Sequence, residues 1–61
     1  MFHIQVNDKF IGAIGSNFSD SSEAIEVLYE LVEDYGYGNK FSVIHDNGEI
    51  FFSEIINKPN L

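Results

Sequence analysis

One segment, from Asp20 to Gly38, has a clear helical period and constrains the fold more than any other part of the chain. At about 100° per residue its apolar side chains gather on one face, formed by Ala24, Ile25, Leu28, Leu31, Val32 and Tyr35. Asp20 is a suitable N-cap, because its carboxylate can accept hydrogen bonds from the free N–H groups of the first turn. Gly36 and Gly38 can adopt the left-handed conformation that ends helices. The pattern predicts an amphipathic helix over residues 21–35.

Four short apolar runs around this helix predict strands. Residues 2–6 alternate apolar and polar side chains, which is the period of a half-buried strand. Residues 10–14 form a second run beyond the turn residues 7–9, so we expect a hairpin with three or four loop residues. Residues 41–45 and 49–56 flank Asn47-Gly48, a strong hairpin signal. The sequence therefore predicts an α+β fold of ββαββ order, a four-stranded antiparallel sheet with the helix packed on one face.

The last hairpin is apolar on both faces. A two-residue turn at Asn47-Gly48 places Ile44 opposite Phe51, whereas a three-residue turn with a bulge shifts the register by one. With the two-residue turn, the helix side receives Phe41, Val43, Ile50 and Phe52. Ile44, Phe51 and Ile55 then point away from the helix and form surplus apolar surface. We interpret this surface as a partner or dimer interface; a different register or coverage by the C-terminal tail would also account for it.

Size and charge limit the class of protein. A chain of 61 residues allows one domain, residues 1–61, and a domain this small is marginally stable, which favours oligomers. Ten acidic residues stand against three lysines and no arginine, a net charge of −7. Such a protein is repelled by nucleic acids and anionic membranes, so basic protein surfaces are the expected partners. Without cysteine, an export signal or a long apolar run, a cytoplasmic setting is expected.

No motif in the sequence supports catalysis, a metal or a cofactor. The two histidines, His3 and His45, have no further metal ligand at a helical spacing. His45 and Asp46 could pair as the base and orienting group of a hydrolase do, but no serine or cysteine nucleophile stands in a strained turn. We therefore predict a non-enzymatic protein without a metal or cofactor. A small-ligand binder or enzyme is a third alternative, which would need a dimer to build its pocket.

Five carboxylates, here called the acidic stripe, lie on the predicted helix opposite its apolar face: Glu23, Glu26, Glu30, Glu33 and Asp34. Like charges four residues apart destabilise a helix by a few tenths of a kcal/mol, and negative charge near a helix C-terminus is also unfavourable. The stripe covers about 16 Å and could imitate a short row of backbone phosphates. Its functional interpretation is a binding face for a basic surface; the alternative is a solvated face that only keeps the protein soluble.

In its short chain, its EAIEVLYELVED helix and its lack of arginine, the protein resembles small acidic phage-encoded inhibitors of bacterial enzymes, including DNA mimics and anti-defence factors. The resemblance implies an inhibitor or regulator and carries over no individual residues. We expect it to bind a basic surface of a partner protein, nucleic-acid-binding surfaces included, through the acidic stripe. The alternative is a homo-oligomeric adaptor or subunit that assembles through Ile44, Phe51 and Ile55.

Overall fold

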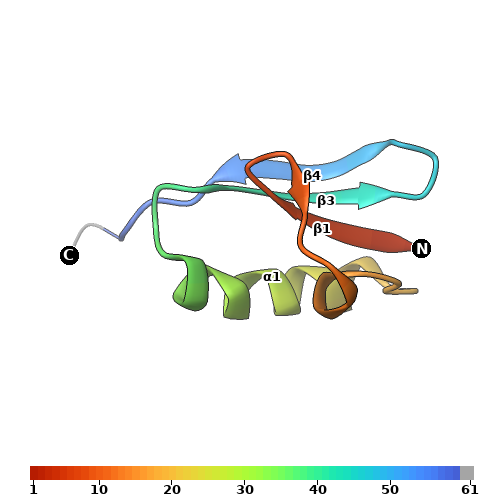
Figure 1. Ribbon diagram of the computed structural model, residues 1–61, viewed down its shortest axis with the longest axis horizontal. Coiled ribbons are helices and arrows are strands. Elements are labelled where there is room, and N and C mark those ends of the chain that lie inside the picture. Colours follow the sequence, from red (N-terminus) through yellow and green to blue (C-terminus); the bar gives the residue numbers. More distant parts are fainter. Residues whose placement is uncertain (60–61) are drawn as a thin grey trace.

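Four strands form one antiparallel sheet, and a single helix covers one of its faces (Figure 1). The computed structural model describes residues 1–59, so Asn60 and Leu61 of the predicted domain lie outside the described residues. The strands are β1 (Phe2–Val6), β2 (Lys9–Phe10), β3 (Lys40–His45) and β4 (Ile50–Ile55), and the helix is α1 (Ser21–Tyr35). The predicted α+β fold and ββαββ order are confirmed. The sheet order is β2-β1-β3-β4, so the two central strands are more than thirty residues apart in the sequence.

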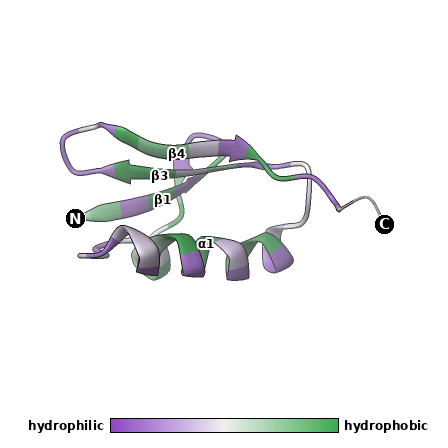
Figure 2. Cartoon of the chain, turned by 180° about the vertical axis from the view of Figure 1, so that it is seen from behind, coloured by the Kyte–Doolittle hydropathy of each residue, from purple (hydrophilic) through white to green (hydrophobic). Residues whose placement is uncertain are grey.

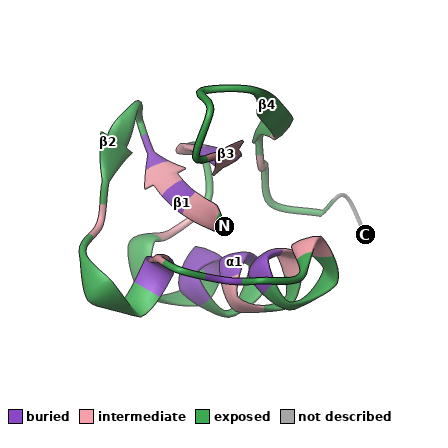
Figure 3. Ribbon diagram, turned by 90° about the vertical axis from the view of Figure 1, so that its right-hand side faces the viewer, coloured by how far each residue is buried: buried purple, intermediate pink, exposed green. Residues whose placement is uncertain are grey.

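Helix α1 has the predicted boundaries. The Asp20 carboxylate accepts a hydrogen bond from the Ser22 backbone N–H at 2.9 Å, and Gly36 ends the helix with φ of 94°. The core lies between the helix and the sheet, where buried residues of α1 meet those of β1 and β3 (Figure 3). Its members are Ile4, Val6, Phe18, Ala24, Leu28, Leu31, Val32, Phe41 and Val43. Tyr35, predicted on this face, is instead 48% exposed, and its ring meets that of Phe41 edge to face.

The first hairpin is shorter than predicted. Val6 pairs with Lys9, so the turn contains only Asn7 and Asp8, both with positive φ, which suits the right-handed twist of a hairpin. The strand predicted over residues 10–14 ends at Phe10. Gly12 has φ of 94° and leaves the extended conformation, and residues 13–15 form a short 3-10 helix, η1 (Ala13–Gly15).

Two asparagines connect the first turn, β3 and the end of the helix. The Asn39 side-chain NH₂ donates to the backbone carbonyls of Tyr35 and Gly36 at 3.1 and 3.0 Å. Its side-chain oxygen accepts from the NH₂ of Asn7 at 2.9 Å. The side-chain oxygen of Asn7 in turn accepts from the Lys40 backbone N–H at 2.9 Å. The helix end is thereby held against a turn more than thirty residues away in sequence.

The second hairpin has a three-residue turn and an extra residue in β4. The extra residue restores the register that the longer turn had shifted by one. Ile44 pairs with Ile50, as expected for a three-residue turn of residues 46–48, but Val43 pairs with Phe52, as expected for a two-residue turn. Phe51 is the extra residue between these pairs, where the register shifts. The predicted pair of Ile44 and Phe51 is therefore wrong, whereas the pair of Val43 and Phe52 is confirmed.

Candidate functional site

The acidic stripe forms the outer side of α1. All five of its carboxylates are exposed, and the buried residues of the helix lie on the opposite side, toward the sheet. Figure 2 shows the same division by hydropathy, with the hydrophilic positions of α1 turned away from the sheet. From Glu23 to Asp34 the stripe extends about 16 Å at 1.5 Å per residue. The expected exposure of these residues is thus confirmed, and the structure brings all five to one surface.

No cation neutralises the stripe within the described part of the chain. The ion pairs shown there join Lys40 to Asp8, at 2.7 Å, and Asp46 to the N-terminal ammonium and to His3. Lys40 is thus engaged with the first hairpin turn rather than with the helix. The carboxylates of the stripe therefore present their charge directly to solvent or to a partner.

One aromatic side chain borders the stripe. Tyr29 follows Glu26 by three residues and precedes Glu33 by four, so it occupies the adjoining strip of the helix surface. It is 53% exposed. Tyrosine combines a large apolar ring with a hydroxyl group and is enriched among the residues that dominate binding energy at protein interfaces. An exposed aromatic side chain therefore adjoins the acidic stripe, and charge patterning alone did not identify it.

The three residues predicted as an apolar interface do not form one surface. The register places Ile44 and Ile50 side by side on the sheet face opposite the helix, because both lie out of phase with the buried Val43. Ile55 lies on that face as well, opposite Lys40, but Ser42 and Ser53 stand between it and Ile44. The two serine hydroxyl groups are hydrogen-bonded at 2.9 Å. The face is therefore interrupted by a polar pair at its centre.

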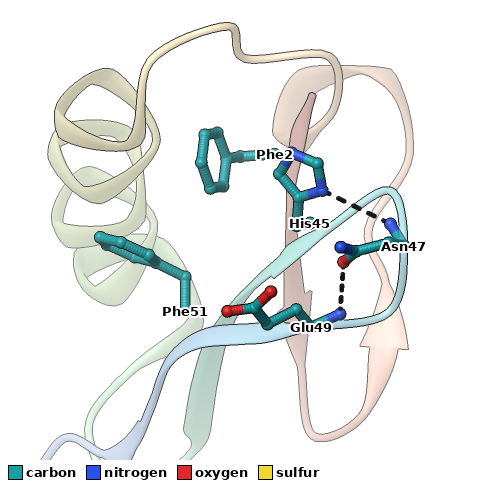
Figure 4. A pocket seen from close by; sticks show the side chains of 5 residues that line it. All are labelled: Phe2, His45, Asn47, Glu49 and Phe51. Carbon is teal, nitrogen blue, oxygen red and sulfur yellow. Dashed lines mark hydrogen bonds between the residues drawn. The ribbon is translucent and has the colours of Figure 1, made fainter.

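Phe51 lies on the helix side of the sheet. Its ring meets that of Phe2 edge to face, with centroids 5.6 Å apart, and Phe2 in turn meets the His45 ring at 5.0 Å. These three rings line a pocket of about 160 Å³ beside the β3–β4 turn, together with Asn47 and Glu49 (Figure 4). Ile50, predicted on the helix side, is instead 63% exposed on the other face. The extra residue in β4 exchanges the positions of Ile50 and Phe51.

Asp46 interacts with a different histidine from the one its sequence position suggests. Its carboxylate contacts the ring of His3 and the N-terminal ammonium, and these hydrogen bonds lower the pKa of Asp46 from 3.8 to about 2. The neighbouring His45 instead accepts, through Nδ1, from the Asn47 backbone N–H at 3.5 Å. Ser16 lines the same open hollow of about 360 Å³ as His3 and Asp46. No bond between Ser16 and His3 occurs among residues 1–59, so the three do not form a nucleophilic relay there.

Residues 1–59 contain no group of three or more histidine or acidic side chains that could hold a metal ion, and no helix among them has the length and apolar character to cross a bilayer. Comparison with known proteins found no matching family model, no similar curated protein and no similar solved structure. Any functional conclusion therefore depends on the chain's own surfaces.

Proposed function

We propose that the protein is a non-enzymatic inhibitor or regulator that binds a basic surface of a partner protein through the acidic stripe. One observation supports the proposal above others: five exposed carboxylates share the outer side of α1 and have no cationic partner among the described residues. The arrangement costs the isolated protein stability, since Glu26, Glu30 and Asp34 follow one another at intervals of four residues. Binding to cations would relieve this repulsion.

The spacing of the stripe suits a partner that binds nucleic acid. Carboxylates one helical turn apart, about 5.4 Å, form a regular row of negative charge, as a nucleic-acid backbone does. A basic groove built to hold phosphates would attract such a row. Because the protein itself carries a net charge of −7, direct binding to nucleic acid is disfavoured. The proposed setting is the cytoplasm, and a sequence without cysteine is compatible with a reducing compartment.

Capture from a bacterial lysate tests this proposal with matched charge changes. Glu30→Lys alters the centre of the stripe, and Glu54→Lys makes the same change in net charge on β4, outside the stripe. We expect a captured partner to be lost with the first variant and retained with the second. Its affinity for the unmodified protein should also fall between about 50 and 300 mM salt, because screening weakens attraction between exposed charges. A partner that binds both variants equally, with no salt dependence, contradicts the proposal.

The second candidate function, a homo-oligomeric adaptor, is favoured by the open face of the sheet. Phe10, Ile50 and Ile55 are 60%, 63% and 60% exposed, so three large apolar side chains meet solvent on this face. The polar pair of serines reduces the apolar area available for assembly. Sedimentation equilibrium separates the two candidates: if this face assembles copies, Ile50→Asp converts an oligomer to a monomer, and a wild-type monomer at high concentration excludes it.

A further inference from the structure

The pocket beside the β3–β4 turn has the components of a cation site. Two phenyl rings, from Phe2 and Phe51, stand 5.6 Å apart between their centroids. These rings meet edge to face and leave no space between them, but both line the pocket, and aromatic rings attract cations held within about 6 Å of their centroids. The sticks in Figure 4 show Phe2 and Phe51 on the same side as the helix, with the carboxylate of Glu49 directed toward them from the turn. The pocket thus combines aromatic surface with a negative charge.

The position of Glu49 is fixed by its backbone. Its N–H donates to the side-chain oxygen of Asn47 at 2.8 Å, and its carbonyl accepts from the His45 N–H at 2.9 Å. Phe2 is fixed in the same way, since it exchanges two backbone hydrogen bonds with Phe18, of 2.7 and 3.0 Å. The carboxylate of Glu49 has no ion-pair partner among residues 1–59. The backbone of Glu49 and Phe2 is therefore held in place before binding, and a cation displaces no ion-pair partner of Glu49 among these residues.

The size of the pocket and the composition of the chain identify the occupant. A volume of about 160 Å³ is well below the ~300 Å³ or more typical of pockets for whole metabolites, so the pocket suits one side chain. A guanidinium group fits the mixed lining better than an ammonium group, because it stacks on aromatic rings, binds carboxylates in a fork and is weakly hydrated. The sequence contains no arginine, so neither this chain nor a second copy can supply one.

We propose that the pocket lined by Phe2, Phe51 and Glu49 receives an arginine side chain of the partner protein. This inference rests on the proposed function and deepens it, because it names the group that a basic partner surface would present outside the acidic stripe. The stripe supplies attraction over a broad surface, whereas the pocket selects one side chain by shape and by ring contact. Together, the stripe and the pocket would discriminate a partner surface that presents arginine from one whose positive charge comes from lysine.

A tripeptide of arginine between two glycines, blocked at both ends, tests the pocket directly. NMR titration of the intact protein should show saturable shifts at Phe2, Glu49 and Phe51. The matched peptides replace arginine by lysine, which keeps the charge, or by citrulline, which keeps the shape without the charge. Glu49→Gln and Phe51→Leu should each weaken arginine binding about 2- to 5-fold, the contribution of one exposed ion pair or cation–π contact. Glu54→Gln, outside the pocket, is the control and should leave binding unchanged.

Three outcomes overturn the assignment. If the lysine peptide binds as tightly as the arginine peptide, the pocket has no preference for guanidinium. If the citrulline peptide binds as tightly, the pocket does not recognise a positive charge. Shifts confined to the acidic stripe, with none at Phe2 or Phe51, place arginine elsewhere on the protein. That last result leaves the proposed function intact, because the stripe would still bind a basic surface. Conversely, pocket binding together with a partner that tolerates Glu30→Lys would contradict the role of the stripe and support the pocket.

Discussion

Removing the side chain of Asn39 should destabilise the protein far more than its place in a surface loop suggests. Asn39→Ala deletes two hydrogen bonds to the carbonyls of Tyr35 and Gly36 and a third from Asn7. Each bond contributes about 0.5–1.5 kcal/mol, and exposed bonds contribute at the lower end because water replaces the lost partner. We therefore expect a loss of about 1–2 kcal/mol. A chain of 61 residues has a total stability of roughly 3–9 kcal/mol, so this loss is a substantial part of it.

The measurement is urea unfolding followed by circular dichroism, with thermal unfolding alongside. The melting temperature should fall by about 5–15 °C, since 1 kcal/mol corresponds to about 4–8 °C in a domain of this size. Asn57→Ala is the matched control, because Asn57 is exposed and its side chain makes no hydrogen bond within residues 1–59. Asn7→Asp, which keeps the acceptor but removes the donor to Asn39, should be less than additive with Asn39→Ala. A loss below about 0.5 kcal/mol, ordinary for a surface substitution, would refute this reasoning.

Three further changes have defined outcomes. Gly15→Ala should cost about 1–3 kcal/mol in thermal unfolding, because a Cβ atom there would lie 2.7 Å from the side chain of Ile11 and 3.3 Å from that of Ile4. Asp46→Asn should lower stability above pH 4 and lose its effect as pH falls toward 2: a pKa lowered from 3.8 to about 2 means that the charged carboxylate stabilises the fold above that range and is neutralised within it. Glu33→Lys should raise stability by about 0.3–1 kcal/mol at low salt, because it places a cation near the C-terminus of α1.

Matched variants distinguish each effect from a general one. For Gly15→Ala the control is Ser16→Ala at the next residue. It should be nearly neutral if crowding against Ile11 and Ile4 causes the loss of stability. For Asp46→Asn the free energy of unfolding is compared with that of the wild type between pH 5 and about 2. A difference that stays constant over this range would show that the hydrogen bonds of the Asp46 carboxylate do not stabilise the fold. For the helix, Glu23→Lys at the opposite end should lower stability, and a gain there would show that net charge rather than helix polarity decides the result.

The sequence predicted the regular parts of the fold because local patterns determine them. Helix α1 follows from its apolar period together with Asp20 and Gly36, and both ends agree with the structure. The order of strands depends on contacts between distant segments, and no local pattern reveals it. The strand expected over residues 10–14 failed because Gly12 adopts a positive φ that takes the backbone out of the sheet. A glycine within an apolar run signals such a break without saying where the chain goes next.

Among the candidate sites, too, those set by a local pattern could be predicted and those set by contacts between distant segments could not. Exposure of the acidic stripe followed from the helical period, whereas the apolar face depended on a register that one extra residue alters. Because Phe51 is that extra residue, it moved to the helix side and Ile50 took its place beside Ile44. The pocket could not be predicted at all, since it joins Phe2 to a turn more than forty residues away. The pairing of Asp46 with His3 depends on the same juxtaposition of β1 with the end of β3.

The sheet order also determines how the chain can fold. The central ladder joins β1 to β3, with Phe2 opposite His45 and Val6 opposite Phe41, so it forms only when segments more than thirty residues apart meet. Closing so long a loop is entropically costly and slows folding relative to a helical protein of equal size. Helix α1 packs on both β1 and β3, so its apolar side is fully covered only after that event. Amide hydrogens of β1 and β3 should accordingly exchange only through global unfolding, while the edge strand β4 exchanges by local fraying.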